Sequence, residues 1–163
     1  MKANCLDPVI DKNCKILILG SMPSVISREK GFYYANPTNR FWKALSFVTD
    51  CNFSDLQTEE KKSLLLEKHI ALYDVFSYCE IKGSSDSDIK NAKINDIPTL
   101  IKNTAIKTIY ITSKKAYTAF TEKYGTEVYG AKVISLPSPS SANRSKFKTD
   151  EQLLYEWKKL FTL

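Results

Sequence analysis

The chain has 163 residues, the usual size of one domain, and such a domain buries about two-thirds of the surface that its unfolded chain exposes. No apolar run approaches the roughly 20 residues of a membrane span, and the first residues lack the apolar segment of a secretory signal. We therefore expect a single domain over residues 1–163, acting in the cytoplasm as a monomer and without a membrane. The net charge of +6 favours a polyanionic partner such as a nucleic acid.

The positive charge is mostly lysine, and the 24 basic residues include only three arginines. Arg28 and Arg40 lie in the segment 15–45, and Arg144 lies in the segment 132–146. Arginine presents a planar set of donors that suits phosphate, whereas lysine is sufficient for surface charge. These two segments are therefore the first candidates for a functional site.

The four cysteines contain no C-x-x-C pair, the spacing that structural zinc sites and iron–sulfur clusters normally use. In a cytoplasmic protein such cysteines are reduced and partly buried. We expect no metal site and no cofactor.

The first elements surround a short strand. Residues 1–14 are polar and predict a mobile arm or a short helix, and residues 15–19 form an apolar run typical of a buried strand. A loop at Gly20–Ser24 and a polar link through Gly31 follow. The apolar spacing of residues 40–48 then predicts a helix.

The rest of the chain alternates helices and strands. Thr58 predicts a helix N-cap, and Ser113 predicts another. The expected elements are, in order, a helix to Lys68, a strand at 69–76, a polar loop at 80–88, a helix at 95–103, a strand at 107–112, a helix at 114–124, a strand at 132–136, a rigid loop at 137–144, and a closing helix that Thr149 or Asp150 caps.

Strands separated by helices indicate a parallel sheet covered on both faces. We predict an α/β fold, a three-layer αβα arrangement with a central, mostly parallel four-stranded sheet. The loops after the first and fourth strands, Gly20–Ser24 and 137–144, then leave the same edge of the sheet. Ligands of open α/β sheets bind beyond this carboxyl edge.

These loops resemble the uracil-DNA glycosylase superfamily. The likeness rests on Gly20–Ser24 followed by Tyr33–Trp42, and it is strongest to the hypoxanthine-DNA (deoxyinosine) glycosylases, with the mismatch-specific uracil/thymine glycosylases next. It spans roughly residues 15–145. Three further segments fit it: Leu72–Val75 followed by Cys79 and Glu80, Gly83–Ser87, and Leu136–Asn143.

The resemblance implies a uracil-DNA glycosylase-like fold and a monofunctional enzyme of base excision repair. Such an enzyme flips a deaminated base out of DNA, hypoxanthine first and uracil as a further substrate, and leaves an abasic site. Its partner is DNA that contains the deaminated base. There are two alternatives. One is a non-catalytic DNA- or nucleobase-binding module on a degenerate glycosylase fold. The other, a nucleotide-binding protein of a different class, lacks the phosphate-loop motifs that it needs.

The catalytic residue implied by the resemblance is Asn39. Most branches place a water-activating Asn or Asp two residues after the first glycine, but here that position is Met22. The hypoxanthine branch uses the asparagine of its Asn-x-Phe-Trp segment, which maps to Asn39. The last motif lacks the histidine of the uracil-specific relatives, and the only histidine is His69. The alternative for Asn39 is that it caps the following helix.

The implied base pocket has a backbone floor and an aromatic wall. Tyr34 is the candidate for stacking on the flipped base with Tyr33 in support, and the alternative is that both rings pack in the core. Asn36 contacts the base or only shapes the turn before Pro37. The expected pocket residues are Gly20, Ser21, Met22, Pro23, Ser24, Tyr33, Tyr34 and Asn36.

The expected DNA contacts come from short hydroxyls, backbone amides and cations. They are Arg40, Ser138, Ser140, Ser141, Asn143, Arg144 and Lys146. The alternative for the Pro-Ser loop is an ordinary surface loop. Asp74, at the end of the second strand, is expected to cap or hydrogen-bond one of the motif loops, and the alternative is a direct catalytic role.

Overall fold

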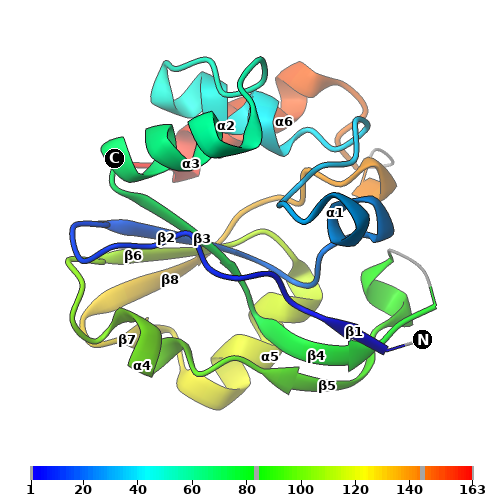
Figure 1. Ribbon diagram of the computed structural model, residues 1–163, viewed down its shortest axis with the longest axis vertical. Helices are drawn as coiled ribbons and strands as arrows, with labels where there is room; N and C mark the ends of the chain where they lie inside the picture. Colours follow the sequence, from blue (N-terminus) through cyan, green and yellow to red (C-terminus); the bar gives the residue numbers. More distant parts are fainter. Residues whose placement is uncertain (1, 83–84, 144–145, 163) are drawn as a thin grey trace.

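The computed structural model describes residues 2–82, 85–143 and 146–162 (Figure 1). Its larger sheet has five strands in the order β3-β2-β6-β8-β7. Their bounds are β2 Ile16–Gly20, β3 Ile70–Asp74, β6 Thr108–Ile111, β7 Glu127–Val128 and β8 Ala131–Ser135. The first four strands in this order are parallel, and β7 pairs antiparallel with β8. The four predicted strands are confirmed. The two-residue edge strand β7 was not predicted, since it is too short for a periodic pattern.

Helices cover both faces of this sheet (Figure 1). The helices α2 (Phe41–Thr49), α3 (Thr58–Glu67) and α6 (Asp150–Leu160) lie on one face, and α4 (Ile97–Ile101) and α5 (Lys114–Tyr124) lie on the other. The residues of β2 alternate between the two cores. Ile16 and Ile18 pack with Trp42, Leu65 and Trp157, whereas Leu17 and Leu19 pack with Ile97 and Phe120. The predicted three-layer αβα fold is confirmed.

A second sheet was not predicted. It is antiparallel, with the order β1-β4-β5, and consists of β1 (Lys2–Asn4), β4 (Phe76–Glu80) and β5 (Lys90–Ile94). The expectation of an arm or helix at 1–14 was wrong, because β1 gains backbone hydrogen bonds only from β4, more than 70 positions away. The expected strand at 69–76 ends at Asp74, and the chain enters the second sheet at Phe76. The exposed edge strand β5 carries no apolar pattern.

The sequence predicted the starts of the longer helices, but it did not predict the short helix that follows β2. Ser113 caps α5 and Thr149 caps α6, as expected. Gln57 rather than Thr58 is the N-cap of α3, in a capping box with Glu60. The polar link after β2 contains α1 (Val25–Lys30), which was expected to be loop. Ser24 caps α1, and Gly31 ends it with a φ of 71°.

Two short 3-10 helices stand at the carboxyl edge of the large sheet, η1 (Asp86–Asp88) and η2 (Ser141–Asn143). The first lies in the predicted polar loop, and the second in the predicted Pro-Ser loop. Among the described residues, no helix has the length and apolar character needed to cross a bilayer.

Candidate active site

A cavity of about 430 Å³ opens at the carboxyl ends of β2, β3 and β6, within the usual size range of ligand pockets. The two loops that sequence motifs singled out face each other across it. The predicted site residues that line it are Gly20, Ser21, Met22, Pro23, Ser24, Tyr33, Tyr34, Asn36, Asn39, Ser138, Ser140, Ser141 and Asn143. Arg40 and Lys146 are not among the lining residues, and Arg144 lies outside the described residues.

The floor of the cavity is formed where β2 and β3 end side by side. Gly20 is the register partner of Asp74, the last residue of β3. A Cβ atom on Gly20 would lie 2.8 Å from Asp74 Oδ1 and 3.0 Å from the Tyr34 hydroxyl, both closer than ordinary contact. Glycine is therefore needed here so that these two side chains can approach the strand end.

Tyr34 is held rigidly in the cavity wall. Its backbone adopts a φ of 50°, and its ring stacks on Phe41 with centroids 3.7 Å apart and planes 11° apart. Its hydroxyl lies 3.2 Å from Thr112 Oγ1. Burial and the charge of Asp74 raise the pKa of Tyr34, so the hydroxyl stays neutral. One ring face is covered by Phe41, and only the other can meet a base.

Tyr33 belongs to the core. Its side chain is only 3% exposed, and its hydroxyl donates to the Asp7 carbonyl at 2.6 Å. Its ring meets Phe32 edge to face. Its hydroxyl thus anchors the amino-terminal segment. Tyr33 also lines the cavity, and its support of stacking on a base stays a prediction.

The two asparagines shape the backbone beside Tyr34. Asn39 Oδ1 accepts a hydrogen bond from the Phe41 N–H at 2.9 Å, so this side chain satisfies one of the free donors at the start of α2. Asn36 Oδ1 accepts from the backbone N–H and the hydroxyl of Thr38, at 3.0 and 2.9 Å, as in a local Asx turn. The turn at Asn36 is thus observed, and Asn39 bonds the first N–H of α2 from the position before the N-cap Arg40. Both residues also line the cavity.

An acidic residue that sequence reasoning missed links three elements. Asp86, in η1, accepts hydrogen bonds from the hydroxyls of Ser21 and Ser113, one on each carboxylate oxygen, both at 2.5 Å. Ser113 also accepts from the Ala116 N–H as the cap of α5. Asp86 therefore fixes the Gly20–Ser24 loop to the start of α5. The only sign of Asp86 in the sequence was its position in the Gly83–Ser87 segment, which fits the family resemblance.

Asp74 is the most unusual group in the cavity. Its side chain is 3% exposed, and within the described part of the chain its Oδ2 atom has no hydrogen-bond partner. Burial, and secondly the negative charge of Asp86, raise its pKa from 3.8 to about 7. Among the described residues, the Oδ2 atom of Asp74 therefore does not make the expected hydrogen bond to a motif loop. A buried carboxyl with such a pKa can exchange a proton near neutral pH.

The Pro-Ser loop forms the opposite wall and is internally braced. Asn143 Nδ2 donates to the Ser138 carbonyl at 3.0 Å, and the Ser140 N–H donates to Ser138 Oγ at 3.3 Å. Trp157 Nε1 fixes the start of the loop by donating to the Pro137 carbonyl at 2.8 Å. Within the loop, Ser138 Oγ accepts the Ser140 N–H and Ser140 Oγ accepts the Ala142 N–H.

Arg40 is buried, which disagrees with the expectation that it contacts DNA. Its side chain is 4% exposed, and its Nη1 atom donates to the Phe147 carbonyl at 2.7 Å. Its backbone N–H donates to the Pro139 carbonyl at 2.9 Å. Arg40 therefore joins α2 to the Pro-Ser loop from inside. Lys146, in contrast, is exposed at the surface.

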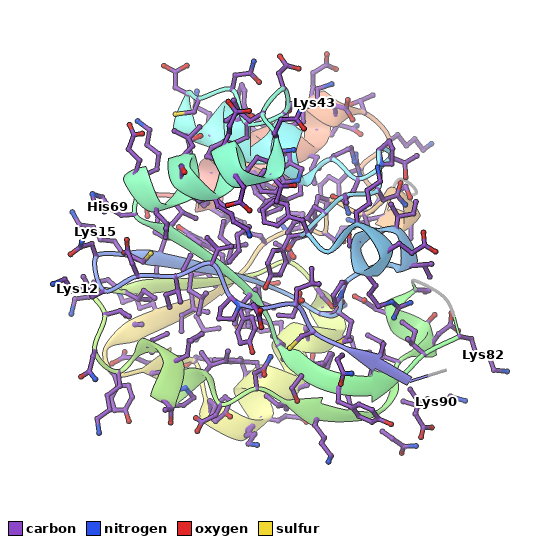
Figure 2. The ribbon with its side chains drawn as sticks, viewed as in Figure 1. Lys12, Lys15, Lys43, His69, Lys82 and Lys90 are labelled. Atoms are coloured by element: carbon purple, nitrogen blue, oxygen red, sulfur yellow. The ribbon has the colours of Figure 1, made fainter. Side chains whose placement is uncertain are left out.

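Two lysines that could not be singled out among 21 also line the cavity, Lys114 and Lys115 at the start of α5. Both are exposed, and Lys115 Nζ donates to the Ile89 carbonyl at 2.7 Å. His69 lies beside Lys15 at the opposite, amino-terminal edge of the sheet (Figure 2). Within the described ranges, no three His, Cys, Asp or Glu side chains come together as candidate metal ligands.

Comparisons with known proteins agree with this architecture. The sequence profile of the Uracil DNA glycosylase superfamily matches residues 8–161. The chain belongs to the uracil-DNA glycosylase superfamily. It is thereby a DNA glycosylase, a hydrolase of N-glycosidic bonds whose substrate is DNA.

The similarity to known proteins extends over almost the whole chain. A hypoxanthine DNA glycosylase of Methanosarcina acetivorans is 38% identical over 156 residues, 94% of each chain. One of Methanosarcina barkeri is 33% identical over 153 residues, 91% of this chain and 93% of that protein. The solution NMR structure of a candidate uracil DNA glycosylase from M. acetivorans has a TM-score of 0.81 and 33% identity, covering 98% of this chain and 96% of that one.

Proposed function

We propose that this glycosylase excises hypoxanthine from DNA, with uracil as a further substrate, and leaves an abasic site. The observation that carries the proposal is the cavity itself, which joins the Tyr34–Asn39 wall to the Pro-Ser loop at the carboxyl edge of the sheet. The two similar proteins named hypoxanthine DNA glycosylase support the choice of base. Met22 at the usual water-activating position favours this branch over the mismatch-specific one.

The cavity supports a division of labour between its walls. Tyr34 would stack the free face of its ring on the flipped base, because its other face is fixed against Phe41. Asn39 would orient the attacking water with the second lone pair of the oxygen that also caps α2. Ser138, Ser140 and the neighbouring loop residues would hold the phosphates.

The reaction would be monofunctional. Cleavage of the DNA strand through a Schiff base needs an amine nucleophile that its surroundings desolvate. Of the two lysines at the cavity, Lys115 is held by a backbone carbonyl, and the side chain of Lys114 is exposed. Neither has the buried, apolar environment of such a nucleophile.

Three broader features belong to the same proposal. The enzyme acts as a monomer, in the cytoplasm, and as a single domain over residues 1–163. The single domain is supported by one core cluster that combines Ala3 and Cys79 of the small sheet with Leu17 and Ile109 of the large one. Light scattering after size-exclusion chromatography tests the monomer, and cell fractionation tests the compartment.

The decisive experiment is a single-turnover assay with an excess of enzyme. Duplexes that carry deoxyinosine, deoxyuridine, deoxyxanthosine or a thymine mismatch are incubated, and one half of each sample is treated with alkali to cut abasic sites. We expect cleavage after alkali for deoxyinosine, then deoxyuridine. A folded enzyme that yields no abasic product from deoxyinosine would refute the proposed substrate. Strand cuts before alkali would refute the monofunctional reaction.

A further inference from the structure

We infer that Asp74 is the acid of the excision reaction and donates its proton to the purine as the glycosidic bond breaks. This inference rests on the proposed excision of hypoxanthine. It assigns a catalytic role to a residue that lies on neither motif loop. Asp74 is the last residue of β3, and its carboxyl borders the cavity floor beside Gly20 and Tyr34.

The reaction needs such a donor. As the bond between the sugar carbon C1′ and the purine N9 breaks, its electron pair passes to the base, and a departing purine anion is a poor leaving group. Protonation at N7 allows a neutral base to leave. Donors aimed at developing charge are a main source of catalysis in enclosed sites. Histidine could donate in this way, but His69 lies at the other edge of the sheet (Figure 2).

The hydroxyls on the cavity floor are already engaged. Ser21 and Ser113 both donate to Asp86. The Tyr34 hydroxyl lies 3.2 Å from Thr112 Oγ1, whose own proton goes to a backbone carbonyl, so Tyr34 is the donor of that pair. Each of these groups would have to leave its partner before it could serve the base.

Asp74 differs because its Oδ2 atom is buried without a hydrogen-bond partner among the described residues. A buried polar atom in this state requires an explanation, and Asp74 is one of the residues that line the cavity which a flipped base would enter. The two carboxyls of the site are thus in opposite environments. Asp86 accepts a hydrogen bond from a hydroxyl on each oxygen, as a carboxylate does, whereas Asp74 is buried and lies near the charge of Asp86, which favours the neutral acid.

The proton balance closes within the site. Asp74 gives its proton to N7 and becomes a carboxylate, while the electron pair of the C1′–N9 bond goes to the purine. A water molecule adds its oxygen to C1′, and the proton that it loses restores the acid form of Asp74. The sum is one water consumed, one neutral hypoxanthine released and one abasic sugar formed.

The titration of Asp74 is set by the groups that surround it. The negative charge of Asp86 raises its pKa, in addition to the larger effect of burial, to about 7. Tyr33, Tyr34 and Tyr73 also face it, and their own pKa values are raised, so they are neutral in this range. Lys114 and Lys115 stand at the cavity rim and are exposed. The excision rate should therefore fall about tenfold per pH unit above pH 7.

The test is the pH dependence of single-turnover excision of deoxyinosine between pH 5 and 9. Asp74→Asn keeps the size of the side chain but has no proton to transfer. We expect its rate to be at least 100-fold lower at pH 6, without the alkaline decline of the wild type. Its affinity for a duplex with a 2′-fluorinated deoxyinosine analogue, which resists cleavage, should stay within about threefold of the wild type.

A second variant keeps the inference testable if Asp74→Asn does not fold. Asp86→Asn removes the charge that raises the Asp74 pKa, so the alkaline decline should begin at lower pH. Asp88→Asn, an exposed acid on the same short helix, is the matched control and should leave the midpoint unchanged.

The outcomes separate the two proposals. A wild-type enzyme that does not release hypoxanthine at any pH defeats the proposed function. A wild-type enzyme that releases it defeats only the role of Asp74 if its profile shows no alkaline decline, if Asp74→Asn matches its rate, or if Asp86→Asn leaves the midpoint in place.

Discussion

Replacement of Gly20 by alanine tests the geometry of the cavity floor. The new methyl group would lie 2.8 Å from Asp74 Oδ1 and 3.0 Å from the Tyr34 hydroxyl, whereas ordinary contacts begin at 3.4 Å. The carboxyl must then move by 3.4 Å less 2.8 Å, or about 0.6 Å. Neither neighbour can yield easily, because Asp74 is buried and the Tyr34 ring is stacked on Phe41.

The expected cost follows from these contacts. Overpacking of a buried site costs about 1–3 kcal/mol of unfolding free energy. A displacement on the order of 1 Å of positioned groups lowers a rate by about 100-fold. We therefore expect Gly20→Ala to lose stability in urea titration and to excise deoxyinosine on the order of 100 times more slowly in single turnover.

The matched control is Gly125→Ala at the far end of α5. No atom lies within 4 Å of a Cβ atom at Gly125, but its φ of 82° is unfavourable for alanine. This variant should lose about 1 kcal/mol of stability and keep its excision rate. The reasoning is refuted if Gly20→Ala excises at the wild-type rate, or if Gly125→Ala slows excision equally.

Further predictions concern Asn39, Arg40, Lys146 and Asp74. Asn39→Ala should lose about 1 kcal/mol of stability with the cap on Phe41 and slow excision at least tenfold. Asn39→Asp keeps an acceptor and should restore the stability, so equal urea midpoints for the two variants would contradict the capping role. Arg40→Ala should lose about 2 kcal/mol, because a buried charged hydrogen bond is removed, without changing the salt dependence of DNA affinity. Lys146→Ala should instead keep the stability and reduce the slope of log affinity against log salt by about 0.9, as for one lost phosphate contact. A changed salt slope in Arg40→Ala together with an unchanged slope in Lys146→Ala would contradict both assignments. Finally, the stability of the wild type should fall relative to that of Asp74→Asn as pH rises from about 4 to about 7. The pKa of Asp74 is raised on folding, so the unfolded chain releases this proton at lower pH than the folded protein does. A difference in the free energy of urea unfolding that stays constant across this range would contradict the raised pKa.

Much of the site could be predicted because its residues follow buried strands directly. The apolar run of β2 places Gly20–Ser24 at the carboxyl edge of the sheet, and the run of β8 places the Pro-Ser loop at the same edge. Parallel pairing then brings the two loops together, although more than 110 positions separate them. Local periodicity also located the caps Ser113 and Thr149, because a capping side chain acts within three residues.

The errors have a different origin. Arg40 reads as a surface cation in any local window, but the fold places it under the Pro-Ser loop against the Phe147 carbonyl. Tyr33 and Tyr34 are neighbours that both line the cavity, and yet the Tyr33 hydroxyl is bonded to the Asp7 carbonyl, whereas the Tyr34 ring stacks on Phe41. Strand β1 has no apolar pattern of its own and exists because β4 offers an unpaired edge.

The chemical state of the cavity depends most on tertiary contacts. The composition and motifs of the chain establish the α/β class, the family and the two loops that line the cavity. The raised pKa of Asp74 cannot be predicted from the motifs, since it arises from burial at the end of β3 and from the charge of Asp86 in another sequence segment. Desolvation and charge–charge interaction depend on distances in space, which only the packed fold defines.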